Sequence, residues 1–107
     1  MTDGIPPPLH VCVYHENPEM LEWLLDHGAD MERREQDYGS TPLNTAVVMR
    51  RKRIIRILVK RGAEASRAMS LAQRGLAGDF EDDPSLDREG YQDIVELLRE
   101  LNVDSGH

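Results

Sequence analysis

The sequence predicts an all-α solenoid of three stacked helix-turn-helix repeats with long connecting loops. Three observations predict it. Two stretches of the 107-residue chain repeat each other at a constant offset of 34 residues. Each copy contains two short apolar segments of helical length, and a glycine follows the second segment of each copy. Because such a helix pair cannot bury its apolar face alone, neighbouring repeats are expected to stack.

The repeat consists of three blocks in one register. The aligned blocks are Pro8-Leu9-His10-Val11-Cys12 with Pro42-Leu43-Asn44-Thr45-Ala46, Met20–Leu25 with Ile54–Val59, and Gly28-Ala29-Asp30 with Gly62-Ala63-Glu64. A third copy is distorted: Ala68–Ala72 follows the first block without its proline, and Ile94–Arg99 follows the second. Ala72 precedes Ile94 by 22 positions, whereas Cys12 precedes Met20 by 8, so the third copy contains an insertion of 14 residues.

Local signals define the ends of the helices. Pro8 and Pro42 suit a first helical turn, where the missing N–H has no partner to lose. Thr41 can cap the helix that follows it through its hydroxyl. Gly28 and Gly62 can end the second helices in the left-handed conformation.

These signals divide a single domain, residues 1–107, into repeats. Repeat 1 covers residues 7–40, and repeat 2 covers residues 41–66 with a shortened loop. Repeat 3 covers residues 67–101 with an acidic insertion at about 76–90, and residues 102–107 form a tail.

The second copy resembles the ankyrin repeat. Thr41-Pro42-Leu43 and Ala46, preceded by Asp37-Tyr38-Gly39 and followed by Leu58-Val59-Lys60-Arg61-Gly62-Ala63, carry the resemblance, and Leu24–Asp30 carries it in the first copy. The resemblance covers residues 7–101 and implies a concave surface that contacts a protein partner. The chain departs from the family in three places. Its first loop is one residue longer than usual, the second, between Gly62 and Arg67, is too short for the family's β-hairpin, and the third copy has the insertion.

The composition predicts a cytoplasmic protein. With 39% hydrophobic and 31% charged residues, the chain has the balance of a globular domain. No apolar run approaches the ~20 residues that a membrane helix needs, so we expect no membrane partner. Residues 1–4 lack the apolar segment of a secretory signal, and a single cysteine, Cys12, fits a reducing compartment.

The net charge of −7 conceals an alternation along the chain. Residues 1–44 contain nine acids and two arginines, which is −7, and residues 73–107 contain ten acids and three arginines, also −7. Residues 45–72 contain eight Lys or Arg residues and one acid, which is +7. A basic middle repeat therefore lies between two acidic ones.

We expect no enzyme activity, no cofactor and no metal. His10 and Cys12 point about 200° apart on a helix, so they cannot bind one ion together with His15. The resemblance instead makes Cys12 a small core residue and His10 a partner of backbone. Residues 79–89 alternate acids as a calcium loop does, but Pro84 replaces the glycine of the sixth position and Gly90 the glutamate of the twelfth.

The tetrad Arg50-Arg51-Lys52-Arg53 is too short a basic footprint for nucleic acid, which we do not expect as a partner. It occupies the same inter-helix turn in repeat 2 as the acidic insertion does in repeat 3. We therefore hypothesise that residues 79–89 lie against residues 50–53. In the alternative, both segments stay solvated and unpaired, because exposed ion pairs contribute only ~0–1 kcal/mol each.

Family resemblance places eight candidate partner-binding residues late in the first helices and in the long first loop. They are Tyr14, His15, Glu35, Gln36, Tyr38, Ser40, Val48 and Met49. For Val48 and Met49 the alternative is ordinary core packing. Tyr38 is the expected aromatic contact, and Trp23 is expected in the core.

We therefore expect a non-catalytic protein-binding module: an adaptor, an inhibitor or an immunity-type binder that uses its concave surface. Its partner is another protein, favoured to carry a basic surface because the outer repeats are acidic. The alternative is a structural or regulatory module that self-associates through its apolar first repeat, Leu9–Tyr14. Both leave the chain a monomer or a weak homodimer.

Overall fold

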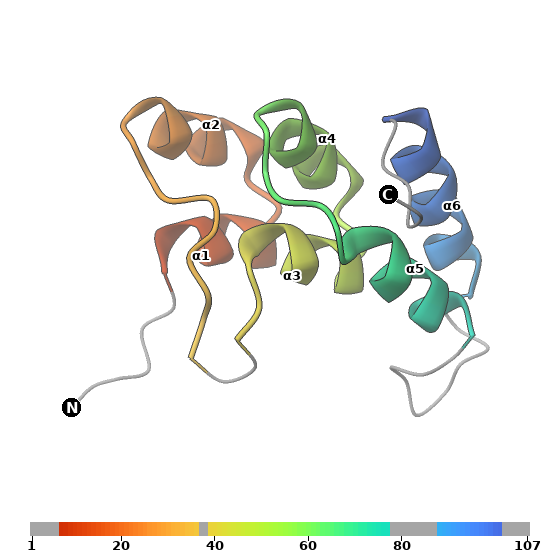
Figure 1. Cartoon of the computed structure of the whole chain (residues 1–107). Coiled ribbons are helices and arrows are strands. Elements are labelled where there is room, and N and C mark those ends of the chain that lie inside the picture. Colours follow the sequence, from red (N-terminus) through yellow and green to blue (C-terminus); the bar gives the residue numbers. More distant parts are fainter. Residues whose placement is uncertain (1–6, 37–38, 78–87, 102–107) are drawn as a thin grey trace.

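In the computed structural model, the described part of the chain forms six α-helices (Figure 1). The structure describes residues 7–36, 39–77 and 88–101, and this part of the chain contains no strand. The helices are α1 (Pro8–Tyr14), α2 (Pro18–Asp26), α3 (Pro42–Val48), α4 (Lys52–Lys60), α5 (Ala68–Leu76) and α6 (Arg88–Glu100). The prediction of an all-α repeat stack is confirmed.

The helices lie in two layers, as Figure 1 shows. The first helices of the repeats, α1, α3 and α5, pack side by side in an inner layer. The second helices form the outer layer, in which α2 packs on α4, and each second helix also packs on the first helix of its own repeat. Both ends of the expected insertion at 76–90 are helical, because α5 extends to Leu76 and α6 begins at Arg88.

One hydrophobic core runs through the stack. The helices of all three repeats contribute fully buried side chains, among them Val13, Leu21, Leu43, Val47, Ile54, Ile55, Leu58, Ile94 and Leu98. Most of these residues come from the apolar blocks that repeat along the sequence, and Val13 and Val47 directly follow the first block of their repeats. The repeated blocks therefore become one continuous core, in which each repeat covers its neighbour.

The helix ends follow the local signals. Pro8 and Pro42 occupy first-turn positions, and the Thr41 Oγ1 accepts a hydrogen bond from the Asn44 N–H at 3.2 Å. Gly28 and Gly62 follow α2 and α4 with φ of 90° and 95°, in the left-handed region. The prediction that both glycines follow the second helices in the left-handed conformation is confirmed.

Removing the cap of α3 gives the first testable prediction. Thr41→Ala is expected to lower the free energy of unfolding by about 1 kcal/mol, because the Asn44 N–H loses its acceptor. Urea denaturation followed by circular dichroism measures the change. Thr41→Ser keeps the hydroxyl and should retain most of the stability. An equal loss in both variants would show that the cap is not the cause.

The expectation that Trp23 lies in the core is wrong. Its side chain is 54% exposed and stacks on the His27 ring, with 3.8 Å between the ring centroids. Met20 is 46% exposed, whereas Ile54, its equivalent in repeat 2, is fully buried. Met20 and Trp23 are exposed because repeat 1 is the outermost of the described repeats. In repeat 2 the equivalent face of α4 packs against repeat 1, but this face of α2 has no described repeat beside it.

Tyr91 connects the third repeat to the second through packing and hydrogen bonds. Its ring is 1% exposed and lies so close to Gly75 of α5 that a Cβ there would overlap it. The Tyr91 hydroxyl donates to the Val48 carbonyl at 2.7 Å and accepts from Arg50 Nη1 at 2.9 Å. The Arg50 guanidinium also lies 5.0 Å from the centroid of the ring. The start of α6 is therefore joined to both α5 and the end of α3.

Candidate protein-interaction surface

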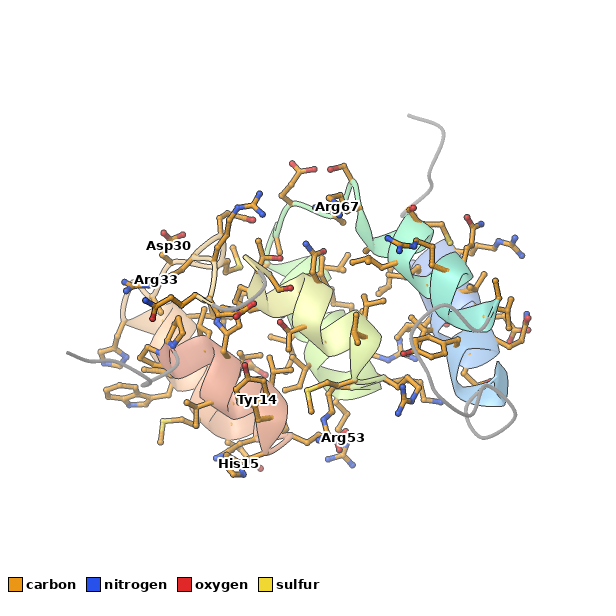
Figure 2. The ribbon with its side chains drawn as sticks, turned by 90° about the horizontal axis from the view of Figure 1, so that it is seen from below. Tyr14, His15, Asp30, Arg33, Arg53 and Arg67 are labelled. Carbon is orange, nitrogen blue, oxygen red and sulfur yellow. The ribbon has the colours of Figure 1, made fainter. Side chains whose placement is uncertain are left out.

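The candidate surface lies at the carboxyl ends of the inner helices. Tyr14 ends α1 and His15 caps it, and the residues 34 positions later, Val48 and Met49, do the same for α3. Because α1 and α3 pack side by side, the two ends are neighbours. Figure 2 looks onto this layer and labels Tyr14 and His15 at the end of α1.

These four residues differ in exposure. Tyr14 and His15 are exposed, whereas Val48 and Met49 are half-buried, and Met49 packs partly against the core. Val48 also uses its carbonyl to accept the Tyr91 hydroxyl. Core packing thus describes part of the environment of Met49, and partner binding by Val48 and Met49 stays a prediction. We call Tyr14, His15, Val48 and Met49 the inner-helix patch.

Arg51 holds the patch in place from repeat 2. Its Nε donates to the Val13 carbonyl at 3.1 Å and its Nη2 to the Tyr14 carbonyl at 2.9 Å. Its Nη1 pairs with the Glu16 carboxylate at 3.4 Å. The last carbonyls of a helix have no partner within the helix. Arg51 supplies that partner, which fixes where Tyr14 and His15 lie relative to α3.

The predicted loop residues have different roles in the structure. Gln36 is exposed, and Tyr38 lies outside the described residues. Glu35 is only 9% exposed, and its carboxylate accepts the Ser40 N–H at 3.0 Å. Glu35 therefore does not take the expected partner-facing position, because the loop needs an acceptor for that N–H. Ser40 is half-buried, and its carbonyl accepts from the His10 ring.

His10 and Cys12 are buried and take part in the packing of α1. The His10 Nε2 lies 2.7 Å from the Ser40 carbonyl, so this ring ties α1 to the loop that leads into α3. Cys12 is buried, and desolvation raises the pKa of its thiol, which keeps it protonated and unreactive. Nowhere in residues 7–36, 39–77 and 88–101 do three His, Cys, Asp or Glu side chains gather as a metal site requires. Residues 79–87 of the calcium-like segment lie outside the described residues, and the last two, 88 and 89, begin α6.

Three of the four side chains of the basic tetrad bond to other residues of the chain. Arg50 bonds Tyr91, Arg51 bonds the end of α1, and Lys52 pairs with Asp93 of α6 at 3.5 Å. Arg53 is exposed on α4 (Figure 2). Most of the segment hypothesised to lie against the tetrad, residues 79–87 of 79–89, is outside the described residues, so that contact stays a prediction.

The charge alternation produces ion pairs between repeats. Arg61 of repeat 2 reaches Asp26 at 2.8 Å and Glu22 at 3.3 Å, both on α2. The hydrogen bond to Asp26 is the main cause that raises the pKa of Arg61, and the hydrogen bond to Glu22 adds to it. On the other side, Arg56 approaches Glu100 of α6 at 3.9 Å. Basic side chains of repeat 2 therefore form ion pairs with both neighbouring repeats.

A cleft that the site prediction missed opens between the two inter-repeat loops. It has a volume of about 220 Å³. Its lining residues are Glu32, Arg34, Thr41, Asn44, Glu64, Ser66 and Arg67. The signal in the sequence was the short loop between Gly62 and Arg67. The loop's length indicated a departure from the family but did not indicate which side chains would line the gap.

Comparison with known proteins agrees with the architecture. A family model described as ankyrin repeats in three copies matches residues 3–68. The chain is similar to ankyrin repeat and SOCS box protein 6 of Homo sapiens, at 45% identity over 38 residues, 36% of this chain and 9% of that protein. It is also similar to the 2-5A-dependent ribonuclease of Homo sapiens, at 36% identity over 53 residues, 50% of this chain and 7% of that protein.

A third relative is the poly [ADP-ribose] polymerase tankyrase of Caenorhabditis elegans. It is 34% identical over 59 residues, which is 55% of this chain and 2% of that protein. The chain thus spans less than a tenth of the length of each of these relatives. No helix among the described residues is long and apolar enough to cross a bilayer.

Proposed function

The chain belongs to the ankyrin repeat family, and on that premise we propose that it is a non-catalytic module that binds another protein through its inner layer. Ankyrin repeats generally mediate protein–protein interaction. The proposed role is that of an adaptor or an inhibitor, in which binding to the partner is itself the function. Repeat stacks suit this role because their side-by-side helices form an extended rigid surface.

The inner-helix patch is the observation that carries the proposal. Tyr14 offers an exposed aromatic side chain, of the kind enriched in interface hot spots. Met49, at the end of the neighbouring helix α3, offers a flexible side chain that can adapt to a partner. Arg51 holds the end of α1 against repeat 2, so the patch is organised before a partner binds, and less ordering is needed on binding.

The charge of the outer repeats supports a basic partner. Several acids of repeat 1 are exposed, including Glu19 and Asp30, whereas Arg51 and Arg61 are already paired within the stack. A partner with Lys or Arg residues would be steered toward the acidic repeats, and its association would slow as salt is raised.

A capture experiment with matched variants tests the proposal. The tagged chain is used to recover partners from cell extract, and the affinity of the recovered partner is then measured. Tyr14→Ala and Met49→Ala are each expected to weaken binding by about tenfold or more, the effect of losing a hot spot. Gln92→Ala, an exposed change on α6, is the control and should leave affinity unchanged. Equal affinity in all three variants would contradict a role for the patch.

Self-association is the second candidate, and the exposed Met20 and Trp23 favour it. These side chains lie on α2 and not on the expected Leu9–Tyr14 helix, where Leu9 and Val13 are buried. Light scattering over a range of protein concentration distinguishes the two functions. A dimer that Trp23→Glu dissociates would favour self-association, and a monomer throughout would remove it.

A further inference from the structure

The two joints between repeats are built differently. At the first joint, His10 of α1 bonds the Ser40 carbonyl just before α3 begins. At the second joint the equivalent residues, 34 and 26 positions later, are Asn44 and Ser66. The asparagine side chain is shorter than histidine, and its amide makes no hydrogen bond with the described residues. The contact that closes the first joint is therefore missing from the second.

The loop at the second joint is also shorter. From the aligned glycine to the first residue of the next inner helix there are 14 positions at Gly28–Pro42 but only 6 at Gly62–Ala68. The second loop is therefore eight residues shorter than the first, and the cleft of about 220 Å³ lies beside it, with Asn44 in its lining.

Asn44 lines this cleft, and its side chain has a polar atom without a partner among the described residues. The residue is 8% exposed, and its buried Oδ1 accepts no hydrogen bond within the described part of the chain. A buried acceptor without a donor costs about 1–3 kcal/mol. A ligand that brings an N–H to Asn44 would recover that cost.

The start of α5 adds a positive group to the same cleft. Arg67 is the N-cap residue of α5 and supplies no side-chain cap, whereas Thr41 caps α3 at the equivalent position. No acceptor among the described residues lies within hydrogen-bond distance of the exposed Arg67 guanidinium. The first N–H groups of a helix attract a negative group, and Arg67 strengthens that attraction.

The remaining charged groups of the cleft are already engaged. Glu32 accepts the Glu64 N–H at 2.7 Å, and Arg34 donates to the Gly39 carbonyl at 2.9 Å. Glu64 accepts from Ser66, whose hydroxyl and N–H lower the pKa of the Glu64 carboxyl. The two carboxylates balance the two guanidinium groups. The cleft therefore suits a ligand with one negative charge better than it suits phosphate, which carries more.

We propose that this cleft binds a carboxylate of a partner peptide together with an adjacent peptide N–H, with Arg67 and the start of α5 holding the carboxylate and Asn44 accepting the N–H. The inference rests on the proposed function and specifies what part of the partner is recognised. Figure 2 shows Arg67 at one edge of the inner layer and Tyr14 toward the other. Since α3 has seven residues and thus spans about 10 Å, an extended peptide can cross from the patch to the cleft.

Titration by NMR of the ¹⁵N-labelled chain tests the site with three synthetic peptides. One is Gly-Gly-Asp-Gly-Gly, acetylated and amidated, which offers a side-chain carboxylate. The second is its Asn counterpart, and the third is acetyl-Gly-Gly-Gly with a free terminal carboxylate. We expect saturable shifts of the Ser66–Met69 amides and the Asn44 side-chain amide with a carboxylate peptide, with Kd of about 1 mM or tighter. The stronger of the two carboxylate peptides identifies the source of the carboxylate.

The same titration defines the results that overturn the inference. These are the absence of saturable shifts with both carboxylate peptides, equal binding of the Asn peptide, or tighter binding of inorganic phosphate. Arg67→Gln and Asn44→Ala are each expected to weaken binding by about tenfold, whereas the control Arg53→Gln should not change it. Neither Arg67 nor Asn44 belongs to the inner-helix patch. Partner capture that depends on Tyr14 and Met49 without any peptide binding would therefore reject this inference and leave the proposed function standing.

Discussion

Replacing Tyr91 with alanine is expected to lower the free energy of unfolding by about 3–5 kcal/mol, as removal of a buried aromatic ring does. The change empties the space between α6 and Gly75 and removes the hydrogen bond to the Val48 carbonyl. It also takes away the ring beneath the Arg50 guanidinium. Chemical denaturation followed by circular dichroism measures the loss, and a change below about 1 kcal/mol would contradict the account of how repeat 3 is attached.

Tyr91→Phe separates the ring from the hydroxyl. It keeps the packing on Gly75 and loses both hydrogen bonds of the hydroxyl, while the Val48 carbonyl and Arg50 Nη1 still bond each other at 2.9 Å. The expected loss is about 1 kcal/mol. A loss as large as that of Tyr91→Ala would show that the hydroxyl, and not the ring, holds the two repeats together.

Arg51→Met is expected to have the second-largest effect, a loss of about 1.5–3 kcal/mol. Methionine keeps most of the aliphatic bulk but leaves the Val13 and Tyr14 carbonyls without the guanidinium that bonds them. Chemical denaturation measures the stability, and the amide shifts of Tyr14 and His15 report the loosened end of α1.

The neighbouring Arg53→Met serves as the control for Arg51→Met. Arg53 is exposed on α4, and a change there should stay within about 0.5 kcal/mol. Equal losses at the two positions would mean that removing a positive charge, and not uncapping α1, is the cause.

Most of the fold could be predicted because its signals are local and repeated. Pro42, Thr41 and Gly62 define helix ends through their own backbone chemistry, so their roles do not depend on distant contacts. The constant offset of 34 residues then implied that equivalent helices stack. The prediction that Trp23 lies in the core is wrong, although Ile54, Ile55 and Leu58 of the equivalent block in repeat 2 are buried, because periodicity does not report whether a neighbouring repeat is present.

Less of the candidate site could be predicted, because side-chain roles in loops depend on which backbone groups need partners. Glu35 looked like a surface residue, but the fold of its loop brings the Ser40 N–H to its carboxylate. The cleft depends on Asn44, Ser66 and Arg67 together, and each of them is unremarkable on its own in the sequence. The contact between Arg50 and Tyr91 spans 41 positions across the irregular third repeat, where no register could be assumed.

The ion pairs of repeat 2 also bear on how the chain avoids misfolding. Repeat proteins contain near-identical units, so a folding chain can join the wrong pair of repeats or exchange a repeat with another copy. If repeat 3 docked directly on repeat 1, Asp93 and Glu100 would meet Glu22 and Asp26, and four carboxylates would face one another without Arg61 or Lys52 between them. We therefore expect the alternating charge to favour the arrangement in which the basic middle repeat lies between the two acidic ones.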